Sequence, residues 1–245
     1  MSGSFDDTRK EIGVGKQAKV YFWNGFAFKL YNSTYPVEWI DNEIRIQNEV
    51  NKTSLPTVKY YKTDNPHITR MDYIDGITLG ERMLKEKYKQ GIEDLIQLQK
   101  QVHSIENINI SNLKITFKNE LQDLDFDKEK KKIALQYLYN IEEKHNLCHL
   151  DFHLLNIMYS FGKYYIIDWV NARLGNPIYD YARTYIILYE IAYRLSQKYL
   201  SLLKKDKTID MKDIDKAIYI MAILRTRESK SEKVQQLIDS MTPRI

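Results

Sequence analysis

The chain has 245 residues, of which 43% are hydrophobic and 29% are charged, and its formal net charge at pH 7 is +4. This length allows one large domain or two small lobes, and the hydrophobic fraction is sufficient for a substantial core. The small positive charge is too evenly scattered to argue for nucleic-acid binding, and no apolar run reaches the roughly 18 residues of a membrane span. We therefore expect neither nucleic acid nor a membrane as a partner.

The single cysteine and the start of the chain indicate the compartment. Cys148 cannot form an intramolecular disulfide, which fits a reducing cytosol, and it is most simply a small buried residue. Residues 1–6 lack the apolar core of a signal peptide. We expect a cytoplasmic protein. The sequence leaves its oligomeric state open.

A glycine-containing hairpin is predicted at residues 12–21. Gly13 and Gly15 are two residues apart, and the small Ala18 precedes a β-branched segment. Glycines let a backbone loop approach a phosphate group closely, although an ordinary β-turn would produce the same pattern. The Gly-x-Gly-Lys sequence is not a Walker A loop, because no Gly-Lys-Ser/Thr opens a helix.

The next two strands, residues 20–23 and 26–31, flank Asn24 and Gly25, the strongest short hairpin signal. Side chains alternate between the two faces of a strand, so Lys29 shares its face with Ala27 and Tyr31. Lys29 is thus a lone cation in an otherwise apolar strand. Such lysines usually mark a solvated edge, but the following segment offers a partner.

A helix is predicted to follow Pro36, because apolar residues recur there at helical spacing. Glu43 lies one residue before Ile44, at the edge of the packed face, and could reach Lys29. A lysine–glutamate pair that places the lysine against nucleotide phosphates is part of kinase active sites. Glu49 is the substitute candidate, and a plain surface carboxylate is the alternative for Glu43.

Two more strands, residues 57–62 and 67–71, are joined by a turn at residues 63–66. Five short strands with one helix after the third form a small β-rich lobe. Strand character ends near residues 71–79, where long helices begin. We therefore divide the chain into an N-terminal lobe, residues 1–72, and a mainly helical C-terminal lobe, residues 73–245.

The helical part contains several predicted helices and few chemical signals. Residues 92–102 carry an apolar stripe, and His103 at its end is expected to pack or cap. Residues 179–199 are expected to form one long buried helix, followed by a basic turn at residues 201–207. The acids after residue 205 alternate with lysines, which gives little support for a polycationic aminoglycoside substrate. Tyrosines could surround a quaternary ammonium such as choline, but packing is the commoner use.

The most informative stretch contains His149, Asp151, His153 and Asn156, with Asp168 following an apolar run. An aspartate that accepts a hydroxyl proton, an asparagine five residues later and a second aspartate form the pattern of phosphoryl transfer. Their oxygen atoms suit Mg²⁺ together with substrate phosphates. A polar turn before a hairpin is the simpler explanation for any one of these residues.

Taken together, these motifs resemble the aminoglycoside phosphotransferase and choline kinase superfamily, small-molecule relatives of the protein kinases. The resemblance covers roughly residues 10 to 185, and its further matching segments are residues 71–76, 102–105, 166–169 and 175–182. It implies an α+β, bilobal protein-kinase-like fold with a five-stranded antiparallel N-terminal lobe. It also implies transfer of a phosphate from ATP or GTP to a hydroxyl of a small molecule, such as an aminoglycoside-like antibiotic, choline or another amino alcohol, or a sugar.

The resemblance also assigns roles to residues. It implies that Asp151 orients the acceptor hydroxyl and takes its proton, with His149 as a structural brace and His153 as a substrate contact or loop support. The nucleotide would be held by a set of side-chain and backbone groups: Gly13, Gly15, Ala18, Lys29, Glu43, Met71 and Tyr73. Mg²⁺ would be bound by Asn156 and Asp168.

Two positions depart from the family pattern, and two other functions stay open. Leu150 stands where the family usually has glycine, and Asn176 where it commonly has aspartate. A protein Ser/Thr kinase is one alternative, although His153 replaces the usual lysine and Asp168 is not followed by Phe-Gly. A catalytically silent binding module is the other. The retention of Lys29, Asp151, Asn156 and Asp168 argues against it.

Overall fold

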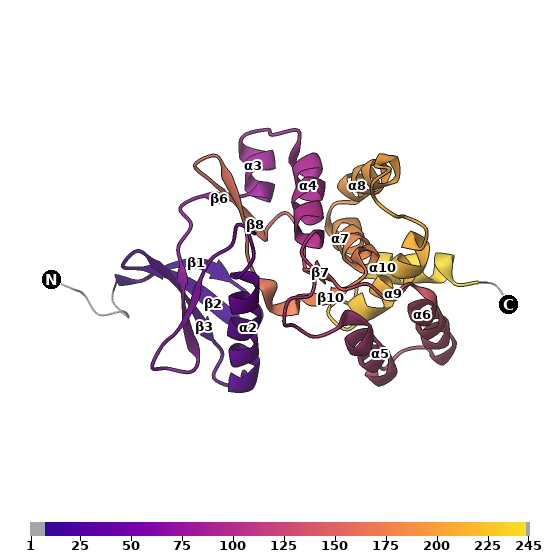
Figure 1. Cartoon of the computed structure of the whole chain (residues 1–245), viewed down its shortest axis with the longest axis horizontal. Helices are drawn as coiled ribbons and strands as arrows, with labels where there is room; N and C mark the ends of the chain where they lie inside the picture. Colours follow the sequence, from indigo (N-terminus) through magenta and orange to yellow (C-terminus); the bar gives the residue numbers. More distant parts are fainter. Residues whose placement is uncertain (1–7, 244–245) are drawn as a thin grey trace. The chain divides into compact units, whose positions relative to one another are not determined.

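The computed structural model of the chain describes residues 8–243, which form two compact units. The first unit comprises the described residues up to Thr78 together with Ile157–Val170, and the second comprises Leu79–Asn156 and the described residues from Asn171 onward (Figure 1). The first is built on antiparallel sheets and the second mainly on helices. The expected α+β class with a five-stranded antiparallel sheet is thereby confirmed.

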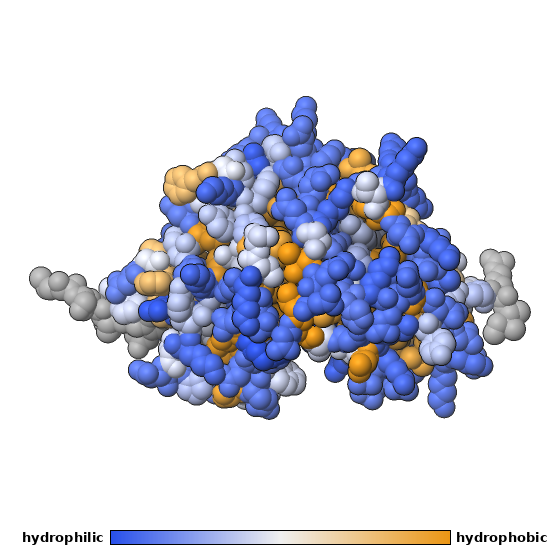
Figure 2. All heavy atoms as spheres, in the orientation of Figure 1, coloured by the Kyte–Doolittle hydropathy of each residue, from blue (hydrophilic) through white to orange (hydrophobic). Residues whose placement is uncertain are grey.

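Hydrophilic residues predominate on the face of the molecule drawn in Figure 2, and hydrophobic residues reach it in smaller areas. Among residues 8–243, every helix is too short or too polar to cross a lipid bilayer.

A five-stranded antiparallel sheet in the order β1-β2-β3-β5-β4 forms the body of the first unit. Asn24 and Gly25, which join β2 to β3, have φ angles of 47° and 81°. Positive φ at both central residues is what a two-residue type I′ hairpin requires, which explains the Asn-Gly pair. The strands are β1 (Lys10–Val14), β2 (Ala18–Trp23), β3 (Phe26–Tyr31), β4 (Tyr60–Lys62) and β5 (Ile68–Asp72).

The helix α2 (Val37–Val50) packs against one face of this sheet. Pro36 precedes it with φ −61°, a value that proline favours and that suits a helix start. Ile40 and Ile44 from the helix share a buried cluster with Ala27 and Tyr31 of β3. Since Lys29 alternates in step with Ala27 and Tyr31, its side chain extends from the face of the sheet that α2 covers.

The first unit also contains a three-stranded sheet made of β6 (Ile77–Thr78), β8 (Ile157–Ser160) and β9 (Lys163–Ile166), in the order β6-β8-β9. The backbone N–H of Ile166 donates to the carbonyl of Pro56 at 2.8 Å. The short 3₁₀ helix η1 (Trp169–Asn171) follows, and the Trp169 indole donates to Thr57 Oγ1 at 3.1 Å. These bonds fix the segment that carries Asp168.

The helices of the second unit surround α7 (Pro177–Ile191) and α9 (Ile214–Arg225), in which most residues are buried. A two-stranded sheet pairs β7 (Asn146–Cys148) with β10 (Arg173–Gly175). β7 leads into residues 149–156, and β10 leads into α7. The other helices are α3 (Leu79–Lys85), α4 (Gly91–His103), α5 (Leu113–Asp123), α6 (Lys128–Asn140), α8 (Tyr193–Lys205) and α10 (Glu232–Met241).

The prediction of one long helix over residues 179–199 is wrong. The chain leaves the helical conformation at Ala192, with φ −149° and ψ 66°, and α8 begins at the next residue. The expected basic turn at residues 201–207 is also wrong, because α8 continues to Lys205. No glycine or proline marks the break. The new helix direction buries Ser196, Tyr199 and Leu203, so tertiary packing overrides the local signals.

We predict that Gly76→Ala destabilises the fold. A Cβ at Gly76 would collide with the carbonyl oxygen of Tyr159 in β8 and lie 2.9 Å from Ser160 Cβ. Because backbone cannot move aside cheaply, the free energy of unfolding should fall by about 1–3 kcal/mol or more. Urea unfolding followed by circular dichroism measures this. The control is Gly13→Ala, whose added Cβ meets its nearest neighbour at 3.6 Å. Equal stability of the two variants would contradict the prediction.

Candidate active site

An ion pair at the helix-covered face of the first sheet joins Lys29 to two carboxylates. Lys29 Nζ lies 2.6 Å from Glu43 Oε1 and 3.5 Å from Asp168 Oδ1. The side chains of Lys29 and Glu43 are 16% and 3% exposed, so the pair is largely removed from water. The expected contact between Lys29 and Glu43 is present. Glu49, the substitute candidate, instead pairs with Lys52 at 2.7 Å.

Burial and charge act in opposite directions on this cluster. Burial alone lowers the pKa of Lys29, but the negative charges of Asp168 and Glu43 more than offset it and raise the pKa well above its usual value. Burial and the negative charge of Asp168 raise the pKa of Glu43 overall, although the charge and hydrogen bond of Lys29 lower it. Lys29 is therefore a permanent cation at neutral pH. The Glu43 carboxylate holds the ammonium group in place at 2.6 Å.

Asp168 has a strained backbone and an unsatisfied oxygen. Its φ angle is +66°, in the left-handed region that non-glycine residues seldom adopt and that is enriched at functional sites. Its Oδ1 atom is buried and has no hydrogen-bond partner among residues 8–243, since the Lys29 ammonium at 3.5 Å gives an ion pair only. A buried carboxylate oxygen without a donor is a position prepared for a cation.

The glycine hairpin and the end of β5 were also assigned to the nucleotide. Gly15 N–H donates to the Ala18 carbonyl at 2.8 Å, which closes the tip of the hairpin between β1 and β2. Met71 is buried between Ala27 and Tyr60 within the sheet. Tyr73 lies beyond the last paired residue, and its backbone makes no hydrogen bond within the described part of the chain. Of the 71–73 segment, Tyr73 therefore has backbone groups available for a ligand.

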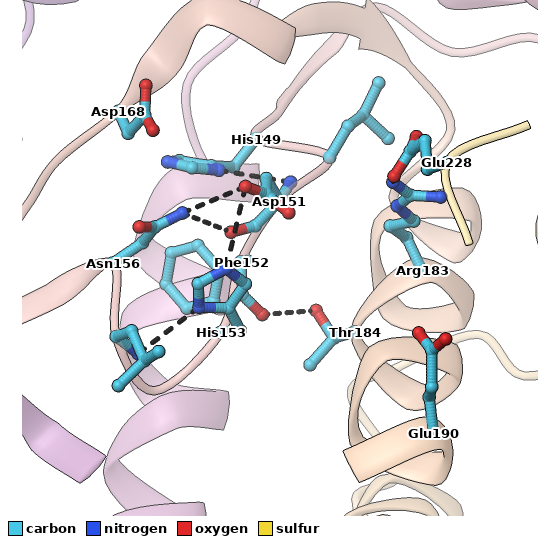
Figure 3. Close-up of polar contacts among 12 residues, drawn as sticks. His149, Asp151, Phe152, His153, Asn156, Asp168, Arg183, Thr184, Glu190 and Glu228 are labelled. Atoms are coloured by element: carbon cyan, nitrogen blue, oxygen red, sulfur yellow. Dashed lines mark hydrogen bonds and ion pairs between the residues drawn. The ribbon is translucent and has the colours of Figure 1, made fainter. Parts of the chain in front are cut away.

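In the second unit, residues 149–156, here called the 149–156 loop, bring Asp151 and Asn156 together (Figure 3). The Asn156 amide donates from Nδ2 to the Asp151 carbonyl at 2.9 Å and to Asp151 Oδ2 at 3.1 Å. Because both bonds use the nitrogen, Asn156 Oδ1 makes no hydrogen bond within residues 8–243. The two bonds orient the carboxylate of Asp151 and leave an amide oxygen for another ligand.

Both histidines of the loop accept hydrogen bonds from backbone N–H groups of the loop. His149 is fully buried, and its Nδ1 accepts a hydrogen bond from the Asp151 backbone N–H at 3.3 Å. His153 Nδ1 accepts from the Leu155 N–H at 3.2 Å, while its Nε2 lies 3.6 Å from Asp151 Oδ2. His149 therefore has a bracing geometry. His153 combines loop support with a position beside the Asp151 carboxylate.

Asp151 stays ionised although it is largely enclosed. Burial raises its pKa, but the nearby His153 and the charges of His149 and Arg183 lower it, to about 2 overall. A carboxylate with so low a pKa is a weak base at neutral pH. It can orient a hydroxyl group and accept its proton only once that proton has become strongly acidic.

Asp180 on α7 holds the start of the loop, and its role was not predicted from the sequence. Its fully buried carboxylate accepts from the backbone N–H of His149 at 3.1 Å, the N–H of Leu150 at 2.7 Å and His103 Nε2 at 2.9 Å. Burial raises the pKa of Asp180. The hydrogen bond and charge of His103, the charge of His149 and the hydrogen bond from the Leu150 N–H lower it overall. His103 packs as expected.

A second buried connection ties the middle of the loop to α7. Thr184 Oγ1 donates to the Phe152 carbonyl at 2.8 Å and accepts from Gln99 Nε2 at 3.0 Å. The Tyr199 hydroxyl donates to Gln99 Oε1 at 2.5 Å. Asp180 and Thr184 are four residues apart, so both project from one face of α7. Acidic and hydroxyl residues at this spacing in an apolar helix are the signal that could have revealed both contacts.

The two departures from the family pattern have structural explanations. Leu150 has φ +61°, a left-handed conformation that glycine adopts without strain. This backbone conformation explains why glycine would suit the position. Asn176 caps α7: its Oδ1 accepts from the Ile178 N–H at 3.0 Å and its Nδ2 donates to the Glu142 carbonyl at 3.0 Å. Asparagine and aspartate cap helices equally well, but only asparagine can also donate.

The residues assigned to Mg²⁺ have the donor atoms that this ion prefers. Asn156 Oδ1 and Asp168 Oδ1 are oxygen atoms without hydrogen-bond donors, each within its own unit. No group of three or more His, Cys, Asp or Glu side chains within residues 8–243 is arranged to hold a metal ion by itself.

Comparison with known proteins gives a family and a fold. The model of the family described as "Phosphotransferase enzyme family" matches residues 8–198. A search of curated proteins finds no significant match.

Several solved structures share the fold at low identity. A thermostable mutant of aminoglycoside phosphotransferase APH(4)-Ia superposes with TM-score 0.68 at 12% identity, over 96% of this chain and 94% of that one. A choline/ethanolamine kinase family protein from Mesorhizobium loti gives 0.66 at 10% identity, over 97% and 86% of the chains. Choline kinase LicA from Streptococcus pneumoniae gives 0.61 at 14%, over 96% and 93%.

We predict that Lys29→Met lowers the free energy of unfolding by about 3–5 kcal/mol, because Glu43 is left as a buried, unpaired charge. The double variant Lys29→Met/Glu43→Gln should lose less than the single variant. The pKa of Lys29 is raised, so its contribution persists below its unfolded pKa of about 10.4 and is constant between pH 6 and 9. Urea unfolding measures all three proteins.

The matched control for this pair is Lys52→Met, which removes a lysine that is 68% exposed from its pair with Glu49. Its effect should stay within about 0.5 kcal/mol. A Lys29→Met variant as stable as this control would show that the buried pair contributes nothing to the fold.

We predict that Asp180→Asn lowers the free energy of unfolding by about 1–3 kcal/mol at pH 7, because three charge-assisted hydrogen bonds lose their charge. The folded pKa of Asp180 is depressed, so its stabilisation is complete above the unfolded pKa of about 3.9 and is lost as pH falls through the folded value. The difference from the unsubstituted protein should therefore shrink below about pH 4. Exposed Asp64→Asn is the control. A gap that widens on acidification would refute the assignment.

Proposed function

The chain belongs to the phosphotransferase enzyme family, and we propose that it moves the γ-phosphate of ATP or GTP to a hydroxyl group of a small molecule. The observation that carries this proposal is the 149–156 loop. In it, an ionised Asp151 is oriented by Asn156 and held in place through Asp180. Phosphoryl transfer needs little covalent chemistry from a protein and depends on positioning and electrostatics.

The nucleotide is assigned to the N-terminal lobe, residues 1–72, and the acceptor to residues 73–245. Lys29, held by Glu43, contacts the phosphates that are not transferred. The backbone of Gly13, Gly15 and Ala18 covers the phosphates, and the segment from Met71 to Tyr73 bonds the base, chiefly through the free backbone groups of Tyr73. Related folds have been solved with AMP-PNP and hygromycin B bound and with ADP bound, which supports a nucleotide as co-substrate.

Asn156 and Asp168 are the proposed protein ligands for Mg²⁺. When bound, the ion offsets negative charge on the phosphates. The unsatisfied oxygens of the two side chains support this assignment. Lys29, which pairs with Asp168, would supply a positive charge in addition to that of the ion.

Asp151 orients the acceptor hydroxyl and accepts its proton late in the reaction. Its low pKa supports this order of events, because a weak base removes the proton only after the oxygen has begun to bond to phosphorus. His149 braces the loop, and His153 holds the carboxylate from the other side.

A small-molecule acceptor is favoured over a protein substrate by the short segment between Asp168 and α7. Only η1 and β10 lie there before α7 begins at Pro177, which leaves no room for the long activation loop of a protein kinase. The structural relatives include both aminoglycoside phosphotransferases and choline kinases. The single buried Cys148 supports the proposal that the reaction takes place in a reducing cytoplasm.

We predict that Asp151→Asn lowers the rate of phosphate transfer by about 10²- to 10⁴-fold and preserves binding of Mg²⁺-nucleotide. An amide has the shape of the carboxylate but cannot accept the proton. The measurements are transfer from labelled nucleotide to a panel of aminoglycosides, amino alcohols and sugars, and nucleotide-induced thermal stabilisation.

Exposed Asp125→Asn, which removes the same charge from the second unit, is the control and should transfer phosphate normally. In the unsubstituted enzyme, the pH profile of kcat should show no acid limb from Asp151 above about pH 4, since its pKa is about 2. Normal turnover by Asp151→Asn would remove Asp151 from its proposed role.

A further inference from the structure

A buried arginine lies on the face of α7 that supports the 149–156 loop. Asp180, Arg183 and Thr184 stand at helical spacing i, i+3 and i+4, and the first and third of them bond the loop directly. Arg183 is 5% exposed, and in Figure 3 it lies across a gap from Asp151, next to Glu228. Its charge is one of those that lower the pKa of Asp151. A largely buried guanidinium therefore lies near Asp151, the residue proposed to act on the acceptor.

Only part of that guanidinium is satisfied. Arg183 Nη2 donates to both carboxylate oxygens of Glu228, at 2.6 and 2.5 Å. Within residues 8–243, its Nε and Nη1 atoms make no hydrogen bond. Neither atom is among the buried, unpartnered atoms of the described residues, so both N–H groups reach solvent and are open to a ligand. Nε–H points to the Nη2 side of the guanidinium and Nη1 lies on the Cδ side, so the two remaining groups can donate separately, each to one oxygen of a carboxylate or phosphate.

Two of the neighbouring carboxylates, Glu190 and Glu228, are already paired with arginine. Glu190 accepts from Arg225 Nε at 2.9 Å and from the Ser229 hydroxyl, and Glu228 accepts from Arg225 Nη1 at 2.7 Å in addition to Arg183. Glu120 is a third acid of this group; burial raises its pKa overall, although the charges of Arg227, Arg173 and Arg183 lower it. An ammonium group arriving here would meet arginines and acids of which two are already paired, which disfavours a polycation.

We propose that Arg183 binds an anionic group of the acceptor, a carboxylate or a phosphate, so that the preferred acceptor is a small hydroxylated acid rather than an amino alcohol or an aminoglycoside. The inference rests on the proposed function, since it names the acceptor class for that site. Arg183 acts as a specificity-determining residue: its free N–H groups fix the acid end of the molecule and thereby direct a hydroxyl toward Asp151.

The test uses four compounds on one three-carbon frame: glycerol, glycerate, glycerol 3-phosphate and 3-amino-1,2-propanediol. They differ only at one end, which is neutral, carboxylate, phosphate or ammonium. Dissociation constants are measured by ligand-observed NMR for the full chain saturated with Mg²⁺ and a non-hydrolysable ATP analogue. At least one anionic compound should bind ten times more tightly than glycerol, and the ammonium compound should bind no better than glycerol. Which anion binds best distinguishes a carboxylate from a phosphate acceptor.

Three variants assign the preference to Arg183. Arg183→Met, of similar length without charge, should reduce the anionic preference to less than twofold, and Arg183→Lys should retain part of it. Glu228→Gln should strengthen anion binding, because it removes the negative charge that shares the guanidinium. The control Arg45→Met removes an exposed arginine of α2 and should bind all four compounds as the unsubstituted chain does. If Arg183→Met does not fold, Glu228→Gln decides, and anion affinity that fails to rise overturns the proposal.

The proposal is also overturned if no anionic compound binds, if the ammonium compound binds best, or if Arg183→Met keeps the preference. These outcomes are separate from failure of the proposed function. Binding of an anion that depends on Arg183, without phosphate transfer to any acceptor, would sink the phosphotransferase assignment and leave the binding site standing. If Asp151→Asn abolishes phosphate transfer and Arg183→Met leaves it unchanged, the phosphotransferase assignment stands and the proposed role of Arg183 falls.

Discussion

The carboxylate of Asp180 is the constraint on which the second unit depends. A fully buried charge is tolerated only when donors surround it, and three donors converge on this one. Two of them are backbone N–H groups of the residues immediately before Asp151. The position of Asp151 is therefore set by the helix α7 rather than by the loop itself. The chain achieves the precision that positioning chemistry needs by anchoring a loop to a rigid element.

In the first unit, the buried charges around Lys29 are balanced less completely than those around Asp180. One ammonium group faces two carboxylates, those of Glu43 and Asp168, so the cluster carries one negative charge in excess. The excess is localised on Asp168, whose Oδ1 lacks a donor and whose backbone is strained. The Asp180 cluster is closed and serves the fold. The Lys29 cluster is incomplete, and an added cation would complete it, which is the electrostatic basis for assigning Mg²⁺ here.

The sequence predicts what is local and misses what is distant. Period-two alternation placed Lys29 on the face that α2 covers, and Asn24-Gly25 and Pro36 located a hairpin and a helix start. The contacts of Asp180 with His103 and of Arg183 with Glu228 span 77 and 45 residues, and such distances leave no periodic trace. The break at Ala192 also escaped prediction, because no residue there restricts the backbone and only packing of α8 requires it.

Leu150 shows how a departure from a family pattern can be compensated. The left-handed conformation costs an L-residue about 1–2 kcal/mol, which glycine would avoid. Burying a leucine side chain contributes about 1.5–3 kcal/mol, and Leu150 is only 6% exposed. Its N–H meanwhile makes the shorter of the two backbone bonds to Asp180, at 2.7 Å. The backbone strain is thus offset by burial and fixed by the same carboxylate that anchors the loop, so Asp151 keeps its geometry without the glycine.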